Sequence, residues 1–277
     1  MKNNEIQVSV FMGVYKQNDK IALEQAVDSI LYQTFQNFEF LIYDDGCCLE
    51  EADMLEQIAQ KDTRIRLLRG EKNRGLAYAL NQCLQKAKGN YIARMDADDK
   101  SAPERLEIQK EFLDNHKEYA FVGLSVELFD EQGVWGVRHM PEYPKAKDFL
   151  KYSPYIHPSV MFRKEVLEEV NGYFVSKDTL RCEDYELFMR LYCMGYLGCN
   201  LKEVLFSYRE NRNWYDKRTW KQRIAEMKIR YIGFQRMGIL NYKTFIYVMK
   251  PVIVTLIPKW IKRNIRQHMA LIQQKEK

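Results

Sequence analysis

Three aspartates fall within one short segment, residues 96–99. Asp96, Asp98 and Asp99 follow an apolar run, residues 91–95, of the kind that fills a buried strand. Crowded carboxylates raise the free energy of each ionised form unless a cation lies among them. Mg²⁺ and Mn²⁺ prefer carboxylate oxygens and keep positions open for water and substrate phosphates. The cluster therefore predicts a site for a metal ion and a diphosphate-bearing ligand at the end of this strand.

The alternative is that these acids only belong to the start of a helix. Ser101 and Glu104 match a capping box, and Pro103 suits the first helical turn. Ser101 can cap that helix by itself, however, so this alternative leaves the three aspartates unexplained. We therefore favour the metal site.

Two neighbouring acids, Asp44 and Asp45, end another apolar run at residues 38–43. A carboxylate there can accept a hydrogen bond from a ribose hydroxyl or a base N–H, whereas the alternative is an Asx turn before Gly46. Such a turn needs one acid, so we favour Asp44 for ligand binding and leave Asp45 open. In the segment 71–75, Arg74 is a better phosphate contact than Lys72 because guanidinium binds phosphate at two points, although both could be solvated loop charges.

A second acidic site, Glu183 and Asp184, lies at the start of a predicted helix, residues 181–191. The acids could simply favour the helix macrodipole, which is a stabilisation of roughly 0.3 to 1 kcal/mol. Beside a metal motif, a carboxylate whose pKa is raised by apolar surroundings could instead act as a general base. We expect Asp184 to be that base.

Strand and helix patterns alternate along residues 7–95, which predicts an α/β fold with a mainly parallel sheet flanked by helices and ligands at the strands' carboxyl ends. The strands are expected at 7–14, 38–43, 65–68 and 91–95, and the helices at 21–31, 50–60 and 75–87. Further on, helices are expected at 104–115 and 164–170 and strands at 120–129 and 159–162. No dinucleotide fingerprint or P-loop occurs in the sequence.

Charge is distributed unevenly over the 277 residues. Residues 215–277 hold 15 of the 43 Lys and Arg but 3 of the 38 Asp and Glu. The apolar stretch 245–258 contains Lys250 and Pro251 and is shorter than the ~20 residues that span a bilayer. Basic residues interleaved with aromatic ones suit an anionic membrane surface, whereas a solvated helical cap and nucleic-acid binding are the alternatives. The aromatic residues are Trp220, Tyr231, Phe234, Tyr247 and Trp260.

The six cysteines form no CxxC pair, and no HExxH motif occurs, so neither a zinc site nor a disulfide framework is expected. The amino-terminal residues show no signal-peptide pattern, and a reduced cytoplasm is the expected location.

The chemical motifs occur in a characteristic order. This order resembles the family 2 glycosyltransferases of the GT-A fold, in particular bacterial members that build capsule, O-antigen and other exopolysaccharides, over about residues 8–209. Each motif alone is a weak or moderate signal, whereas six in sequence are a strong one. The motifs are Val14-Tyr15, 44–46, 71–75 leading to Leu80-Asn81, 96–99, 157–163 and Glu183-Asp184.

The resemblance implies roles for the matching residues. Asp184, beside Glu183, would be the catalytic base, and His157 and Trp214 would lie on the acceptor side, although a lone histidine before proline is about as often a packing residue. Gly13 and Cys47 stand where many members have proline and serine. Nucleotide-sugar contacts would be Val14, Tyr15, Asp44, Arg74 and Asp96, and the metal ligands Asp98 and Asp99.

The implied activity is an inverting, metal-dependent transfer from a nucleotide sugar, expected to carry UDP, to a hydroxyl of a polyprenyl-diphosphate-linked saccharide. Mg²⁺ or Mn²⁺ would be the cofactor, no nucleic acid would bind, and the protein would rest on the inner face of the cell membrane. Residues 1–100 would bind the nucleotide sugar, 101–213 the acceptor, and 214–277 would form a basic helical tail. Two alternatives are a binding protein without catalysis and a nucleotidyltransferase, for which residues 13–17 are a poor Gly-rich loop.

Overall fold

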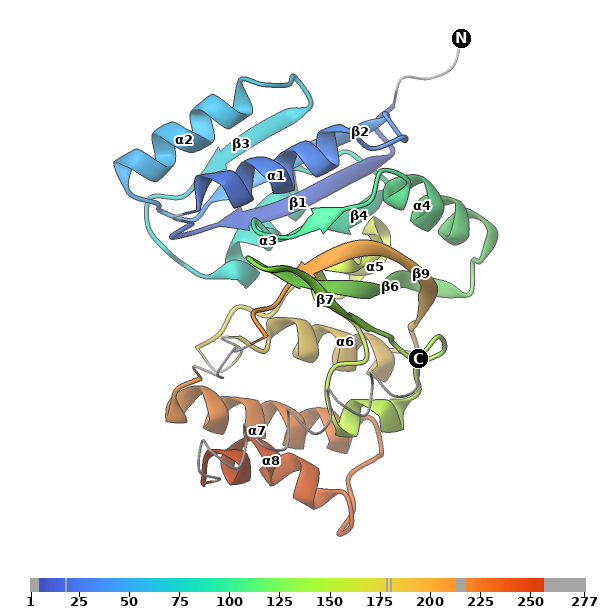
Figure 1. The fold of residues 1–277 in the computed structure, drawn as a ribbon. Helices are drawn as coiled ribbons and strands as arrows, with labels where there is room; N and C mark the ends of the chain where they lie inside the picture. The colour runs from blue at the N-terminus through green and yellow to red at the C-terminus, as the bar shows by residue number, and fades with distance from the viewer. Residues whose placement is uncertain (1–4, 18, 178, 180, 213–217, 257–277) are drawn as a thin grey trace.

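The computed structural model describes residues 5–17, 19–177, 179, 181–212 and 218–256. Within these residues a nine-stranded sheet has the order β3-β2-β1-β4-β8-β6-β9-β5, with β7 paired to β6. Helices cover both faces of this sheet (Figure 1). The fold class predicted from the sequence, an α/β sheet flanked by helices, is confirmed.

The first half of the sheet is parallel, and the predicted alternation is confirmed here. Every residue of β2 is buried, as expected for a central strand that is covered on both faces. β1 and β2 end side by side at Val14 and Asp44, so the loops that follow them meet at one edge of the sheet. The strands are β1 (Val8–Val14), β2 (Phe38–Asp44), β3 (Ile65–Arg69) and β4 (Tyr91–Arg94), and the helices between them are α1 (Lys20–Leu31), α2 (Leu49–Ala59) and α3 (Leu76–Lys86).

The second half of the sheet is mixed, so the parallel arrangement predicted for the sheet does not extend through it. β8 is antiparallel to both β4 and β6, while β6 and β9 are parallel. β9 was not predicted because Lys202 and Glu203 are exposed and lie out of register between two paired residues, which breaks the apolar alternation. The strands are β5 (Lys100–Ser101), β6 (Tyr119–Asp130), β7 (Gly133–Arg138), β8 (Met161–Arg163) and β9 (Leu197–Arg209).

The predicted capping box at Ser101 is wrong. Ser101 belongs to β5, and α4 (Arg105–Asn115) begins after Glu104, which makes no side-chain cap. The side chain of Gln33 holds this helix start instead, because its Oε1 accepts from Leu106 N at 2.9 Å and its Nε2 donates to Ala102 O at 2.6 Å. The cap therefore comes from a distant loop, which local spacing cannot reveal.

Two hydrophobic cores lie on opposite faces of the sheet because successive strand residues point to opposite sides. α1, α2 and α4 cover one core, and α3, α5 and α6 cover the other. α7 packs on α6 and α8 on α7, which places this helical pair at the far end of the molecule from α2 (Figure 1). In the described part of the chain, none of the helices reaches the length and hydropathy of a membrane-spanning segment. The remaining elements are α5 (Lys164–Glu169), α6 (Glu183–Cys193), α7 (Trp220–Arg236), α8 (Phe245–Leu256) and the 3₁₀ turns η1 (Ala146–Leu150) and η2 (His157–Ser159).

Candidate active site

A cavity of about 480 Å³ opens at the carboxyl ends of β1 and β4. Its wall is formed by the loop after β1, the loop that leads into α3, the aspartate loop after β4 and the start of α6. Asp96 and Asp98 share this wall with Glu183. The two acidic motifs that are far apart in the sequence therefore meet in one cleft.

The cavity includes part of the predicted site. It is lined by Val14, Tyr15, Asp96, Asp98 and Glu183. Trp214 lies outside the described residues, so its predicted acceptor role stays a prediction. The other predicted site residues are absent from the lining, namely Asp44, Arg74, Asp99, His157 and Asp184.

The three aspartates of the loop have different surroundings. Arg94, fully buried beneath the loop, donates from Nη2 to the carboxylate of Asp96. Burial and the charge of Asp96 raise the pKa of Asp98 to about 6. Asp99 is 1% exposed, and its Oδ1 accepts from Arg209 N at 2.7 Å. Asp99 therefore fastens the loop to β9, while Asp96 and Asp98 face the cavity.

The predicted metal ligands are accordingly separated. In the described residues, no group of three or more His, Cys, Asp and Glu side chains could hold a metal ion together. Mg²⁺, however, commonly binds through one or two carboxylates plus substrate phosphates and water. The carboxylate of Asp98, beside Asp96 on an open cavity wall, fits such a cation, with the remaining positions supplied by a diphosphate and water.

The neighbouring acids Asp44 and Asp45, of which Asp45 was left open in the sequence analysis, have different surroundings in the structure. The Oδ1 of Asp44 accepts from Cys47 N at 2.8 Å, a local side-chain to backbone bond similar to the Asx turn considered as the alternative but one residue longer. Asp45 lines the cavity and accepts from Arg74 N at 2.9 Å and Gly75 N at 2.8 Å. Asp45 thereby ties the loop into α3 to the end of β2.

The two loops approach so closely that a glycine is needed between them. Gly46 has a φ of 76°, and a Cβ there would lie 2.5 Å from the backbone of Lys72. Arg74 is exposed, and its guanidinium stacks 3.8 Å from the ring centroid of Tyr78. Its neighbour Gly75 lines the cavity, so Arg74 lies beside the site with its side chain held against α3.

Glu183 and Asp184 occupy the first turn of α6. Burial, and then the charge of Asp184, raise the pKa of Glu183 to about 7. The Oε2 of Glu183 is buried and has no hydrogen-bond partner in the described part of the chain. Burial also raises the pKa of Asp184, and a hydrogen bond from Tyr185 N opposes this rise. Both carboxylates are thus shifted toward the range in which a base can exchange protons near neutral pH.

His157 is 7% exposed and does not line the cavity. Its Nε2 lies 2.7 Å from the hydroxyl of Tyr173, and its ring meets that of Tyr173 edge to face. Burial lowers the pKa of His157 well below its usual value, which keeps the ring neutral. This environment matches the packing alternative considered for His157.

Arg181 lines the cavity but was not singled out from the sequence. It is exposed, has a left-handed φ of 66° and precedes the acidic pair by two residues. Only its position near Glu183 could have drawn attention to it. Lys16, with a φ of 52°, is a second cationic residue of the lining that lacked a sequence signal.

The fold and the cleft define a protein of the GT-A class, with a carboxylate loop at the ends of parallel strands. The family model described as glycosyl transferase family 2 matches residues 9–170, and the chain belongs to this family. The chain is 34% identical over 272 residues to EpsE of Bacillus subtilis strain 168, which is named as a glycosyltransferase, with coverage of 98% of this chain and 97% of EpsE. It is 28% identical over 270 residues to the UDP-Gal:alpha-D-GlcNAc-diphosphoundecaprenol beta-1,3-galactosyltransferase of Escherichia coli, covering 93% and 94% of the two chains.

Solved structures agree on the fold. Residues 1–349 of TarS from S. aureus, in complex with UDP-GlcNAc, superpose with a TM-score of 0.69 at 15% identity, covering 96% of this chain and 79% of that one. The mannosyltransferase PcManGT of Pyrobaculum calidifontis, in complex with GDP-Man and Mn²⁺, gives a TM-score of 0.59 at 17% identity and covers 96% and 80%. The resemblance stated from the sequence motifs is thereby confirmed.

Proposed function

We propose that this glycosyltransferase moves a sugar from a UDP sugar to a hydroxyl of a lipid-linked glycan in bacterial surface polysaccharide synthesis, with inversion at the anomeric carbon. The observation that carries the proposal is the cleft shared by Asp96, Asp98 and Glu183. A relative acts on a diphosphoundecaprenol-linked sugar, and a structural neighbour holds UDP-GlcNAc. These relatives support the choice of donor and acceptor.

The donor side would use the loops after β1 and β4. Tyr15 and Asp45 line the part of the cleft next to the ends of β1 and β2, where a nucleoside would fit, and Asp96 would accept a hydrogen bond from a donor hydroxyl. Asp98 would hold Mg²⁺ or Mn²⁺. When bound, this cation would offset the charge that develops on the leaving nucleoside diphosphate.

The acceptor side would use the start of α6. Asp184 would take the proton from the attacking hydroxyl, and burial would keep the pKa of that carboxylate raised for this task. Attack from the face opposite the leaving diphosphate inverts the configuration in a single displacement. Glu183, and not Asp184, lines the cavity, so substitution of each residue tests which carboxylate is the base.

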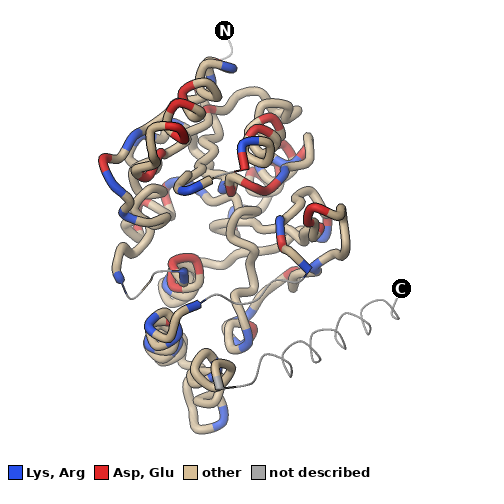
Figure 2. The backbone as a smooth tube through the Cα atoms, turned by 60° about the vertical axis from the view of Figure 1, so that its left-hand side comes forward, with Lys and Arg blue, Asp and Glu red and all other residues tan. Residues whose placement is uncertain are grey.

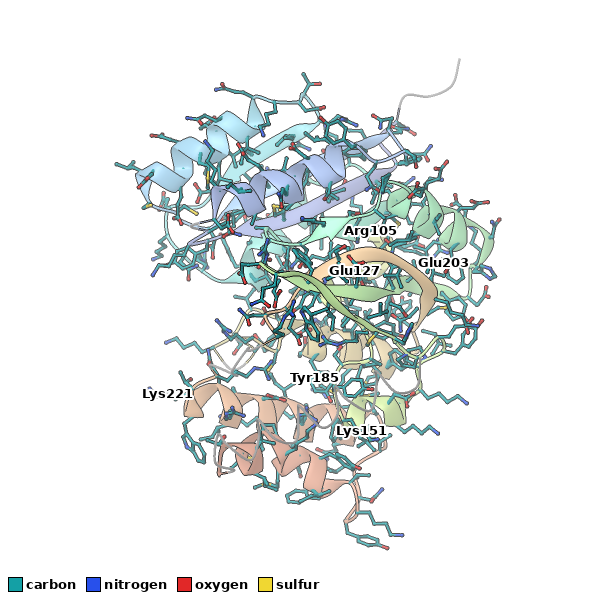
Figure 3. All side chains as sticks on the ribbon, viewed as in Figure 1. Arg105, Glu127, Lys151, Tyr185, Glu203 and Lys221 are labelled. Carbon is teal, nitrogen blue, oxygen red and sulfur yellow. The ribbon has the colours of Figure 1, made fainter. Side chains whose placement is uncertain are left out.

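The helical pair α7–α8 would rest on the membrane that carries the acceptor. Between residues 219 and 256 the single acidic residue, Glu226, is buried and paired with Arg230 at 2.9 Å. Figure 2 shows Lys and Arg along this pair, and Figure 3 shows Lys221 projecting from the first turn of α7. Apolar side chains are exposed beside these cations, which suits an anionic interface. They are Tyr231, Ile232, Tyr242, Phe245 and Ile246, each at least 45% exposed.

This surface differs from the one expected from the sequence. Phe234 is fully buried and Tyr247 is partly buried against the core, whereas Tyr242 and Phe245 are exposed. Trp260 lies outside the described residues. Removal of α8 would also disturb α7, because Arg230 Nη1 on α7 donates to Tyr247 O on α8 at 3.5 Å. Substitution of surface residues leaves that packing intact.

A triple substitution to serine at Tyr242, Phe245 and Ile246 tests the membrane surface. We expect the variant to sediment with phosphatidylglycerol vesicles at least about tenfold less than the wild type, because each apolar side chain contributes about 1 kcal/mol or more at an interface. Leu49→Ser, at an 86% exposed site on α2, is the control. Equal sedimentation of the triple variant and the control would argue against this surface.

The activity itself is tested with a panel of nucleotide sugars and an undecaprenyl-diphosphate-linked sugar acceptor. We expect transfer from a UDP sugar that is lost on chelation and restored by Mg²⁺ or Mn²⁺, with a β-linked product from an α-linked donor. Retention of configuration, or transfer in the presence of chelator, would contradict the proposal.

A further inference from the structure

A buried guanidinium beneath the aspartate loop has no part in the mechanism above. Arg94 ends β4 and has no exposed surface. Its Nη1 donates to Phe11 O at 3.2 Å and to Met95 O, and its Nη2 donates to Asp96. Its Nε is buried without a hydrogen-bond partner in the described residues. A buried ion pair with an unsatisfied N–H is a weak source of stability, so this arrangement calls for another explanation.

The guanidinium acts unequally on the two carboxylates of the cavity wall. Asp96 is tied to Arg94 through Oδ1, which leaves its second oxygen for the cavity. Near Asp98, Arg209 Nε donates to the main-chain oxygen of this residue at 3.1 Å and not to its carboxylate. Two carboxylates that lie on the same wall are therefore neutralised to different extents.

We propose that Arg94 is a positioning residue that gives these carboxylates different tasks. By orienting Asp96 and offsetting part of its charge, Arg94 keeps it as a hydrogen-bond acceptor for the donor and leaves Asp98 as the carboxylate for the metal ion. This inference rests on the proposed function, because it requires a donor and a cation in the cavity. Arg94 itself lies outside the cavity wall, yet it would determine which carboxylate of the wall contacts the donor and which binds the metal ion.

Removal of the Arg94 guanidinium should change the affinity for metal in a direction that the loss of a purely structural contact would not. Without Arg94, Asp96 would carry an uncompensated charge next to Asp98, and both carboxylates would attract a dication. Metal would then bind more tightly, while the acceptor oxygen for the donor would be lost. Tighter metal binding together with slower transfer is therefore the signature of positioning. Simple damage to the loop would weaken both.

The chain offers a matched control in Arg105, which is equally buried. Its Nη2 donates to Arg94 O at 2.9 Å and its Nε donates to Gln109 Oε1 at 3.0 Å. Its hydrogen-bond partners thus include no carboxylate, so Arg105→Met removes a buried cation without freeing Asp96. Figure 3 shows Arg105 close to the sheet between β4 and α4.

The test measures Mn²⁺ affinity of the full chain without nucleotide, by titration calorimetry or electron paramagnetic resonance. We expect folded Arg94→Met to bind Mn²⁺ about tenfold more tightly than the wild type, since it gains one uncompensated charge near the cation. Its transfer rate should fall, while Arg105→Met should lose thermal stability and keep the wild-type affinity for Mn²⁺. Unchanged or weaker Mn²⁺ binding by folded Arg94→Met would overturn the proposal.

If Arg94→Met does not fold, substitution of each of the two carboxylates tests the proposal. Asp96→Asn should lower Mn²⁺ affinity by less than about threefold and lower donor affinity more, whereas Asp98→Asn should abolish Mn²⁺ binding. Equal losses of Mn²⁺ affinity in both variants would refute the division of tasks. Because these affinities are measured without turnover, an enzyme that binds Mn²⁺ but transfers no sugar would contradict the proposed function alone.

Discussion

The loop at residues 96–99 and the acidic pair at the start of α6 both place carboxylates in one cleft, but their surroundings differ. Arg94 donates to the carboxylate of Asp96, and Arg209 donates from its backbone to Asp99. Glu183 and Asp184 receive backbone N–H groups, which only partly offset burial. The pKa of Asp98 in the loop is also raised, by burial and then by the charge of Asp96, so a bound cation would stabilise its ionised form, whereas Glu183 and Asp184 could exchange protons without a cation.

The largest effect should come from the loop. Asp98→Asn removes the carboxylate that is expected to hold the cation. We therefore expect the transfer rate to fall by about 10²-fold to 10³-fold, which is the loss in rate typical of removing one group that stabilises developing charge. Steady-state rates at saturating Mn²⁺ measure this effect.

Asp99→Asn is the matched comparison because its carboxylate contacts Arg209 N and not the cavity. It should lower thermal stability while much of the transfer rate remains. A greater loss of Mn²⁺ binding in Asp99→Asn than in Asp98→Asn would reverse the assignment made here.

The acidic pair should separate binding from transfer. Asp184→Asn should keep UDP-sugar affinity and lose about 10²-fold to 10⁴-fold in rate, as expected for removal of a general base. Glu183→Gln should lose less. If Glu183→Gln shows the larger loss, then the residue that lines the cavity is the base. Wild-type turnover in both variants would remove the pair from the mechanism.

A smaller effect concerns stability and pH. The folded-state pKa of Glu183 is about 7, above its ordinary value of 4.5. Between these values the folded chain binds more protons than the unfolded chain, so this residue's contribution to stability falls as pH rises through the window. Glu183→Gln should therefore raise the melting temperature by a few degrees at pH 8 and leave it nearly unchanged at pH 4. The same difference at both pH values would show that Glu183 does not titrate in this window.

The sequence predicted the parallel half of the sheet well because its strands are continuous apolar runs such as residues 38–43. It did not predict β9, where Lys202 and Glu203 interrupt the pattern. The sequence also could not show which of two adjacent acidic residues faces the cavity. Asp44 and Asp45 are adjacent, and only the geometry at the end of β2 shows that Asp45 faces the cavity.

The same limit applies to the acidic pair and to the metal loop. Consecutive helical residues point about 100° apart, so the rotation of α6 decides which of Glu183 and Asp184 faces the cleft. Asp99 is buried against Arg209 because β9 lies beside the loop, a contact between residues 110 positions apart. Long-range packing of this kind cannot be predicted from the local sequence pattern.

The close approach at Gly46 bears on any attempt to change nucleotide preference by directed evolution. A library that randomises residues 44–48 would lose most members at position 46, since even alanine would place its methyl carbon 2.5 Å from the Lys72 backbone. The displaced chain would move Gly75, Asn73 and the wall they form. Diversity is better directed to Tyr15, which lines the cavity and is 42% exposed, than to Gln17, whose Nε2 donates to Ala97 O at 3.2 Å and so joins two loops.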